Sequence, residues 1–469
     1  MDLPPTDFVV QLLKVFKMEP SLSLLAYGFG TISDLERLCQ AAYFPTEPIS
    51  LGQLATMHGI MVFLLREWVL RPGMPFPEQF DYAEIMSLCE KNFESAIKTY
   101  EVFANPTLDN TKALRIAATW GQDRTDVNTC WMNTSCAARH ALSLGLHRKA
   151  SYADLTAEDA NNRRRLFWSI YTHDKSVSLT LGQSPTIQDD DIDVEMFDAS
   201  PDPRFAPWDH ANQAFYNMAK IEGMIYTRLY TAAALRKTNE ERLAIAAELE
   251  QSLKNWWQQY MPVVWYSLIS TIHRGTYATS ASPGTITPAC YQAACRSIEC
   301  HLEALDHTRG FVNGEMVHVY LSWNLLYGTF TPIIVVFLHV ISSFDGRDLE
   351  LLLQFYNSLE NLPDSSEGTT RFRNACAIFC SVAKAYVGTN AMVPSTAPVQ
   401  TEAIVRREDI QQAFDPAQMT GYSNAAQNSA LNWGQFDPSN LDGMYTFVDN
   451  WMDGTQQSID FLNMDLSNM

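Results

Sequence analysis

Three sets of histidine, cysteine and glutamate residues in this chain have spacings at which their side chains could bind zinc. On an α-helix, residues three, four or seven apart share one face. The sets are Cys376 with Cys380, Glu299 with Glu303 and His307, and His140 with His147. A structural zinc site takes four ligands, and none of these sets has the missing ligands nearby in the sequence. We therefore expect no metal at any of them.

A fourth arrangement has the alternating acids of a calcium-binding loop. Asp189, Asp191 and Asp193 stand where the first ligands of such a loop would lie. Val194 then occupies the sixth position, where the turn requires glycine, and Ser200 occupies the twelfth, where a glutamate is required. We expect a solvated acidic loop here instead of a calcium site.

Motifs for catalysis and phosphate binding are absent from the sequence. It contains no Gly-x-Ser-x-Gly, no Walker loop and no Gly-x-Gly-x-x-Gly, since Gly28-Phe-Gly30 lacks the third glycine. The nine cysteines include no Cys-x-x-Cys pair, which predicts buried, reduced thiols. These observations predict a protein that is not an enzyme and binds no cofactor of its own.

The elements that position these side chains are predicted to be helices. Apolar residues recur at intervals of three and four, and strand-like alternation is nowhere sustained, so the fold class is all-α. A helix over Ala113–Trp120 is expected to be capped by Asp109 or by Asn110-Thr111. Two apolar faces are predicted, one through Trp131, Ser135, Ala138 and Leu142, the other through Leu166, Ile170, His173, Val177 and Leu181. Later helices are predicted at 210–235, 240–260, 289–307, 317–330, 333–342, 349–359 and 371–387.

The formal net charge of −20 and the pI near 4.9 make the surface acidic. An acidic surface repels phosphate, which argues against direct DNA contact and favours protein partners. Met316–Phe344 contains no charged residue, but polar residues and Pro332 interrupt it and leave no run of 18 apolar residues. We expect two buried helices broken at Pro332 and no membrane span. The start of the chain also lacks the features of a signal peptide.

The segment from Pro106 to Met196 contains a series of short motifs in a fixed order. They are Leu144-Gly-Leu-His147-Arg, Arg164-Arg165 ahead of Trp168, Asp174 on the following turn, Gly182-Gln-Ser-Pro185 and Asp190-Asp-Ile-Asp193. Together they resemble the middle homology region of fungal zinc-cluster transcription factors. The structural signature implied by this resemblance comprises Arg164, Arg165, Trp168, Asp174, Gly182 and Pro185. The segment departs from the family at Lys175, where arginine is usual, and at the Gly-Gln-Ser-Pro turn, which is longer.

The resemblance implies a nuclear transcription regulator built of stacked helical hairpins. In that family a helical domain controls an activation segment, sometimes in response to a small effector. The six-cysteine DNA-binding module that normally precedes this region is not in the sequence. We therefore expect action on DNA through a separate N-terminal zinc cluster, which alone would bind zinc, or through a DNA-binding partner or homodimer. An effector pocket would be apolar and lined by Trp323, Tyr327 and Phe330. The alternative is a helical small-molecule receptor or an enzyme without a recognisable catalytic motif.

The basic cluster Arg163-Arg164-Arg165 is too short for a nucleic-acid patch or a nuclear import signal. Its position at a helix start predicts local ion pairs with Asp154, Glu158 and Asp159. Asp174 shares an apolar face with Phe167 and Ile170, so its carboxylate needs a charged or multiply hydrogen-bonded partner. The candidate partners are Arg164, Arg139 and Arg115. No second acid, base or metal ligand stands near Asp174 to support a catalytic role.

Residues 408–469 contain nine acidic residues and no Lys or Arg, and they include too few apolar residues to offset the entropy of ordering. We expect this tail to be disordered. Its aromatic residues are Phe414, Tyr422, Trp433, Phe436, Tyr445, Phe447, Trp451 and Phe461. Acidic-aromatic segments are typical of activation domains, in which charge repulsion keeps the rings exposed for a coactivator groove. The candidate activation residues are Trp451, Phe461, Leu462 and Leu466.

Four parts of the chain are predicted from these patterns. A helical segment covers 1–80, and the helical regulatory domain covers 81–388. A linker covers 389–407, where apolar residues thin out, and the activation tail covers 408–469.

Overall fold

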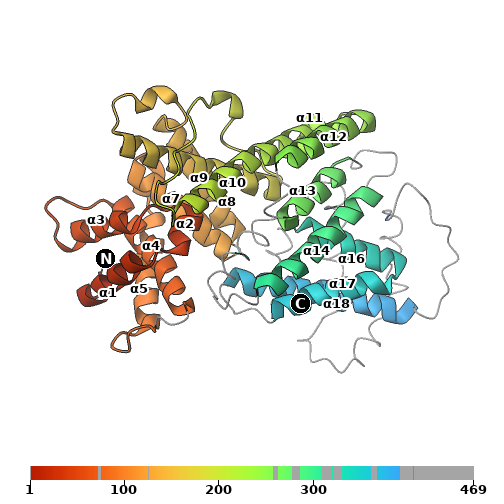
Figure 1. Cartoon of the computed structure of the whole chain (residues 1–469), viewed down its shortest axis with the longest axis horizontal. Coiled ribbons are helices and arrows are strands. Elements are labelled where there is room, and N and C mark those ends of the chain that lie inside the picture. Colours follow the sequence, from red (N-terminus) through yellow and green to blue (C-terminus); the bar gives the residue numbers. More distant parts are fainter. Residues whose placement is uncertain are drawn as a thin grey trace. The chain divides into compact units, whose positions relative to one another are not determined.

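A computed structural model describes residues 2–71, 75–124, 126–256, 262–276, 286–308, 320, 330–360, 367–390, 405 and 451. Within these residues the fold is all-α, as the sequence predicted (Figure 1). The β-pairing found there is a single antiparallel bridge between Ile286 and Val405. The chain divides into two compact units, and the described residues of each are treated separately below.

The first unit comprises Met1–Val177, Pro185–Lys220 and Phe311–Leu321. The last two of its helices, α9 and α10, continue beyond its boundaries. The helices of this unit are α1 (Thr6–Met18), α2 (Leu22–Tyr27), α3 (Ile32–Tyr43), α4 (Leu51–Leu70), α5 (Tyr82–Ile97), α6 (Tyr100–Ala104), α7 (Leu108–Asp123), α8 (Val127–Ser143), α9 (Ala157–Leu181) and α10 (Ala206–Ile225).

Helix α4 forms the centre of this unit, because every residue from 55 to 65 is buried. It packs against α5 and α7, and α7 pairs in turn with α8. Glycines permit these close approaches. A Cβ at Gly59 would lie 2.8 Å from side-chain atoms of Ile116 and Phe93, and one at Gly121 would lie 2.8 Å from the main-chain nitrogen of Cys130. The helices therefore pack at distances that a larger residue would prevent.

Two local predictions in this unit need correction. Thr107 caps α7, since its side chain accepts the N–H of Asn110 at 3.1 Å. The expected caps Asp109 and Asn110-Thr111 lie inside the helix, because Thr107 already has the extended backbone of an N-cap residue. On α8, the predicted face through Trp131 and Leu142 is half-buried. The buried face instead follows Cys130, Thr134, Ala137, Ala138 and Ala141.

The second unit comprises Ser178–Ser184, Ile221–Gly310 and Ser322–Met469. A π-helical turn, η3 (Tyr226–Tyr230), opens a series of helices in it. They are α11 (Ala232–Leu235), α12 (Asn239–Trp256), α13 (Pro262–Arg274), α14 (Pro288–Thr308), α16 (Thr331–Ser343), α17 (Gly346–Glu360) and α18 (Glu367–Asn390).

Helix α16 forms the centre of the second unit. It contacts α13, α14, α17 and α18, which lie around it in Figure 1. Its residues from 331 to 341 are buried apart from the half-buried His339. Phe337 packs on Phe379 with ring centroids 4.7 Å apart, and Phe330 packs on Phe372 at 5.2 Å. This aromatic core joins α16 to α18.

Most predicted helices after residue 200 are present, with two differences. The predicted helix 210–235 is interrupted, because the α-helix gives way to the π-helical turn and Thr231 is extended. Helix α13 was not predicted. The predicted helix 317–330 lies outside the described residues except for Tyr320 and Phe330. Within the described residues, no helix has both the length and the apolar character needed to span a bilayer.

Candidate functional site

Helix α9 carries the basic and aromatic residues of the sequence signature. The guanidinium of Arg165 donates to both carboxylate oxygens of Asp209 on α10, with Nη2 at 2.8 Å from Oδ2. It also donates to the carbonyl of Asp198 at 2.9 Å and stacks over the ring of Phe197 at 4.2 Å. Trp168 donates its indole N–H to the carbonyl of Glu195 at 3.0 Å. These contacts fasten α9 to the segment that leads into α10.

The arginine cluster forms ion pairs, but not with the predicted acids. Arg164 lies 3.8 Å from the carboxylate of Glu195, and Arg165 pairs with Asp209. The expected partners Asp154, Glu158 and Asp159 were therefore wrong for both residues. Asp159 instead interacts with the hydroxyl of Thr156 at the start of α9. The true partners are distant in sequence, so helix spacing could not identify them.

Asp174 is 2% exposed and accepts two main-chain hydrogen bonds. Its Oδ1 accepts the N–H of Thr186 at 3.0 Å, and its Oδ2 accepts the N–H of Ile187 at 2.9 Å. The predicted partners Arg164, Arg139 and Arg115 are not the residues that bind it. Burial raises the pKa of Asp174, and the two main-chain bonds act in the opposite direction. The carboxylate thus holds the chain after Pro185 against α9.

Lys175, the departure from the usual arginine, still forms an ion pair. Its ammonium is 3.1 Å from Oδ1 of Asp189 and donates to the carbonyl of Ile187 at 2.7 Å. The hydroxyl of Tyr171 donates to the same Asp189 oxygen at 2.7 Å. Gly182 has a φ of 64°, a left-handed conformation that favours glycine at the end of a helix. The two departures from the family therefore leave an ion pair at Lys175 and a glycine turn at Gly182.

The acidic loop is exposed at Asp189, Asp191 and Asp193, as predicted, and its carboxylates also bind groups of the protein. Besides Asp189, Asp191 pairs with Arg148 at 3.2 Å, and Asp193 accepts the main-chain N–H of Lys149 at 2.7 Å. The three carboxylates therefore point at different partners and do not converge on one ion. The loop also contacts the Leu144-Gly-Leu-His147-Arg motif, because the main-chain carbonyl of His147 accepts the N–H of Asp193 at 3.1 Å.

The described parts of the candidate zinc sets have other partners. Glu299 and Glu303 both pair with Arg296, at 2.9 and 3.0 Å. His140 interacts with the carbonyl of Phe103 at 2.9 Å. All nine cysteines are free thiols, and seven of them are buried. Within the described ranges no three His, Cys, Asp or Glu side chains are grouped so that they could hold a metal ion.

The predicted effector pocket lies largely outside the described residues, because Trp323 and Tyr327 are among those not described. Phe330 is buried in the core between α16 and α18. It borders a cavity of about 20 Å³, which also contacts His301 and Phe355. A space of that size holds at most about one water molecule. Phe330 is therefore a core residue in this structure.

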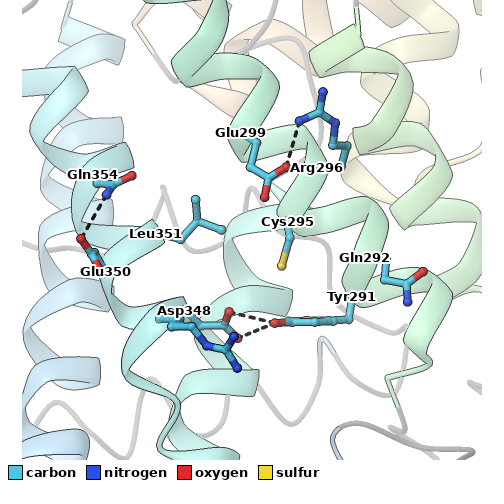
Figure 2. A pocket seen from close by; sticks show the side chains of 10 residues that line it. Tyr291, Gln292, Cys295, Arg296, Glu299, Asp348, Glu350, Leu351 and Gln354 are labelled. Atoms are coloured by element: carbon cyan, nitrogen blue, oxygen red, sulfur yellow. Dashed lines mark hydrogen bonds and ion pairs between the residues drawn. The ribbon is translucent and has the colours of Figure 1, made fainter.

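A larger hollow lies between α14 and α17, with a volume of about 500 Å³. Figure 2 shows the hydroxyl of Tyr291 directed at the carboxylate of Asp348, to which it donates at 2.8 Å from each oxygen. His339 of α16 forms a hydrogen bond with the same carboxylate through Nδ1. Burial and the bond to Asp348 raise the pKa of Tyr291, so its hydroxyl remains a donor. No pattern in the sequence points to this triad, because its members come from three helices.

Both walls of this groove carry charged residues. Arg296 pairs with Glu299 on α14, and Gln354 donates to Glu350 on α17 at 3.3 Å. Cys295 and Leu351 also line the groove, and the sulfur of Cys295 is directed towards the Tyr291–Asp348 pair (Figure 2). The groove is large enough for a small molecule. Its main polar groups are already satisfied by each other, so a ligand would have to displace existing bonds.

Trp451, the described residue of the predicted activation tail, is 1% exposed. The guanidinium of Arg274 at the end of α13 lies 4.2 Å from the centroid of the indole ring. Its Nη2 donates to the carbonyl of Trp451 at 2.6 Å. The expectation that charge repulsion keeps this ring exposed is therefore wrong for Trp451. The other candidate residues Phe461, Leu462 and Leu466 lie outside the described residues.

Comparison with known proteins agrees with the signature on α9. Residues 78–258 match the fungal specific transcription factor domain. An uncharacterised transcriptional regulatory protein of Schizosaccharomyces pombe is 23% identical over 267 residues, which cover 50% of this chain and 35% of the relative. An ABC-transporter-regulating transcription factor of Aspergillus fumigatus is 24% identical over 338 residues, covering 60% of this chain and 37% of that protein. A negative regulator of pleiotropic drug resistance from Candida glabrata is 28% identical over 134 residues, covering 28% of this chain and 13% of its own length.

Residues 78–258 are therefore a fungal specific transcription factor domain, the middle domain of fungal transcription regulators. This match agrees with the class of protein that the signature on α9 resembles. The matched region spans little more than a third of the length of the first two relatives.

Proposed function

We propose that this chain is a nuclear, non-enzymatic transcription regulator in which the helical domain controls the acidic tail 408–469. The observation that supports this most strongly is the fungal specific transcription factor domain at 78–258. Within it, three signature residues of α9, Arg165, Trp168 and Asp174, bind the segment that runs from α9 into α10. The acidic, aromatic composition of the tail supports its role as the activating part.

The same proposal specifies the partners. Coactivators bind the tail through its aromatic residues, in the helix-in-groove mode. DNA is reached through a zinc cluster on a separate N-terminal segment, or through a DNA-binding partner or homodimer. Zinc belongs to such a cluster and not to residues 1–469. The acidic surface supports this division of tasks, since a charge of −20 opposes contact with DNA phosphates.

A reporter experiment tests the tail directly. Residues 408–469, fused to an unrelated DNA-binding domain, should activate transcription of a reporter in a fungal host. Replacing Trp451, Phe461 and Leu462 together with alanine should strongly reduce activation, because these residues supply the apolar contacts to the coactivator. A triple alanine variant at Gln456, Gln457 and Asn463 is the matched control and should retain activity. A silent fusion, or full activity of the aromatic variant, would contradict the proposal.

A further inference from the structure

Trp451 occupies a defined seat on the second unit, formed by Arg274 and Tyr230. Arg274 stands between two rings, 4.2 Å from the centroid of Trp451 and 5.6 Å from that of Tyr230. A guanidinium held over the face of an indole ring is attracted by the ring's electron density, most strongly where water is excluded. The hydrogen bond from Arg274 to the carbonyl of Trp451 adds a contact to the backbone, so the seat binds both ring and main chain.

The seat is built by a local irregularity of the fold. Tyr230 ends the π-helical turn Tyr226–Tyr230, and its hydroxyl donates to the carbonyl of Thr271 on α13. This bond links the π-helical turn to the helix that carries Arg274. Turns of this kind are rare and concentrate at functional sites. With Trp451 in place, Tyr230 is buried and Arg274 is partly buried.

A second point of the chain after α18 is also bound to this unit. The N–H of Ile286 donates to the carbonyl of Val405 at 2.9 Å, in the antiparallel bridge noted above. Val405 is fully buried, and Ile286 is 5% exposed. Both described residues beyond α18, Val405 and Trp451, are therefore buried against the second unit and shielded from solvent.

We propose that Trp451 is a latch, which holds the acidic tail in a closed state by inserting its ring beside Arg274 and Tyr230. This inference rests on the proposed function, in which the same tail activates transcription. A ring that is 1% exposed cannot enter a coactivator groove, so seating and coactivator binding exclude each other at this residue. The occupant of the seat is this chain's own tail. A coactivator would have to capture Trp451 when it leaves the seat.

The latch is tested with a residue outside the tail, so that the activating sequence stays intact. The full chain is fused to an unrelated DNA-binding domain. Arg274→Ala should raise reporter output several-fold, because the tail loses its seat. Arg274→Lys keeps the charge but loses the flat guanidinium, so its reporter output should lie between those of the wild type and Arg274→Ala. Arg347→Ala is the control, since that side chain is 93% exposed on α17, and it should behave as wild type.

Hydrogen exchange on the full chain gives a readout that does not depend on activation. The peptide that contains Trp451 should exchange several-fold faster in Arg274→Ala than in wild type or Arg347→Ala. Peptides from α9 and α14 should be unchanged in all three proteins, which shows that the variant is folded. Equal exchange at Trp451 in wild type and Arg274→Ala would overturn the latch. Protection that appears only at high protein concentration would place Trp451 in a second copy, and would also overturn it.

The two proposals fail in different ways. If the tail alone activates but Arg274→Ala leaves both reporter output and exchange unchanged, the latch is wrong and the proposed function stands. If the tail alone is silent while exchange at Trp451 depends on Arg274, the contact is real but does not restrain activation, and both proposals fall as stated.

Discussion

At the scale of single residues, Asp174 is a buried carboxylate bound by main-chain groups. Its two oxygens accept the N–H groups of Thr186 and Ile187, which belong to the segment following the α9 turn. Lys175 beside it pairs with Asp189 further along the same segment. Two neighbouring side chains of opposite charge thereby fix one stretch of backbone. Asp174 and Lys175 therefore fix the position of the loop that follows Pro185.

Asp174→Ala should lower the free energy of unfolding by about 1–3 kcal/mol, because it leaves the buried N–H of Ile187 without an acceptor. This is less than the loss expected for a stranded arginine. Chemical denaturation measures it. Asp190→Ala, an exposed change in the same loop, should stay within about 0.5 kcal/mol of wild type. Equal stabilities of the two variants would show that the Asp174 bonds contribute nothing.

At the scale of elements, helix packing in the first unit depends on small residues at crossing points. Gly121 lies where α7 meets α8, and a Cβ there would face main-chain atoms of Cys130, at 2.8 Å from N and 3.2 Å from Cα. Backbone on a neighbouring helix cannot rotate away as a side chain can. The separation of α7 and α8 is therefore set by the absence of a side chain at this position.

Gly121→Ala should destabilise the protein by about 1–3 kcal/mol, although alanine is the better helix former, because the two helices must move apart. Gly346→Ala on α17 is the matched control. A Cβ there would meet nothing within 4 Å, so the change should be neutral or slightly stabilising. Thermal unfolding of the two variants compares them. A stabilised Gly121→Ala protein would mean that the α7–α8 contact is looser than described.

The sequence predicted most of the later helices but missed one. Strong three-four periodicity identified α14, α16, α17 and α18 within a few residues of their ends, whereas α9 begins at Ala157, before the predicted start at the Arg163 cluster. Helix α13 was missed, because its sequence is rich in β-branched and serine residues, and burial in the tertiary structure stabilises it instead of local propensity.

Side-chain partners were the least predictable feature. Asp209 for Arg165, Ile187 for Asp174, and the triad of Tyr291, His339 and Asp348 all join residues that come together only in the folded chain. Helical spacing describes neighbours within one element, so it proposed local acids and nearby arginines. The signature residues were assigned in another way, from their order along the chain, which carries the resemblance.

At the scale of the whole molecule, the acidic charge determines how the chain can meet DNA. A net charge of −20 repels the phosphate backbone, which opposes the basic contacts that release counterions from DNA. This charge supports the proposed division between an acidic regulatory part and a separate DNA reader.

Residues 1–469 as a purified protein should bind double-stranded DNA no better than an unrelated acidic protein at physiological salt. Fluorescence anisotropy with a labelled duplex measures this, and a salt series shows whether any signal is electrostatic. The control is the same chain fused to an unrelated DNA-binding domain, which should bind that domain's site. Tight, sequence-dependent binding by the chain alone would contradict the expected division of tasks.

The full or partial burial of the nine free thiols bears on how this protein reacts with oxidants. Burial raises the pKa of every one of them, to about 12 for Cys39, Cys89 and Cys295. At neutral pH only about one thiol in 10⁵ of such a kind is ionised, and the thiolate is the form that peroxides and electrophiles attack. These cysteines should therefore react slowly with peroxides and electrophiles while the domain is folded.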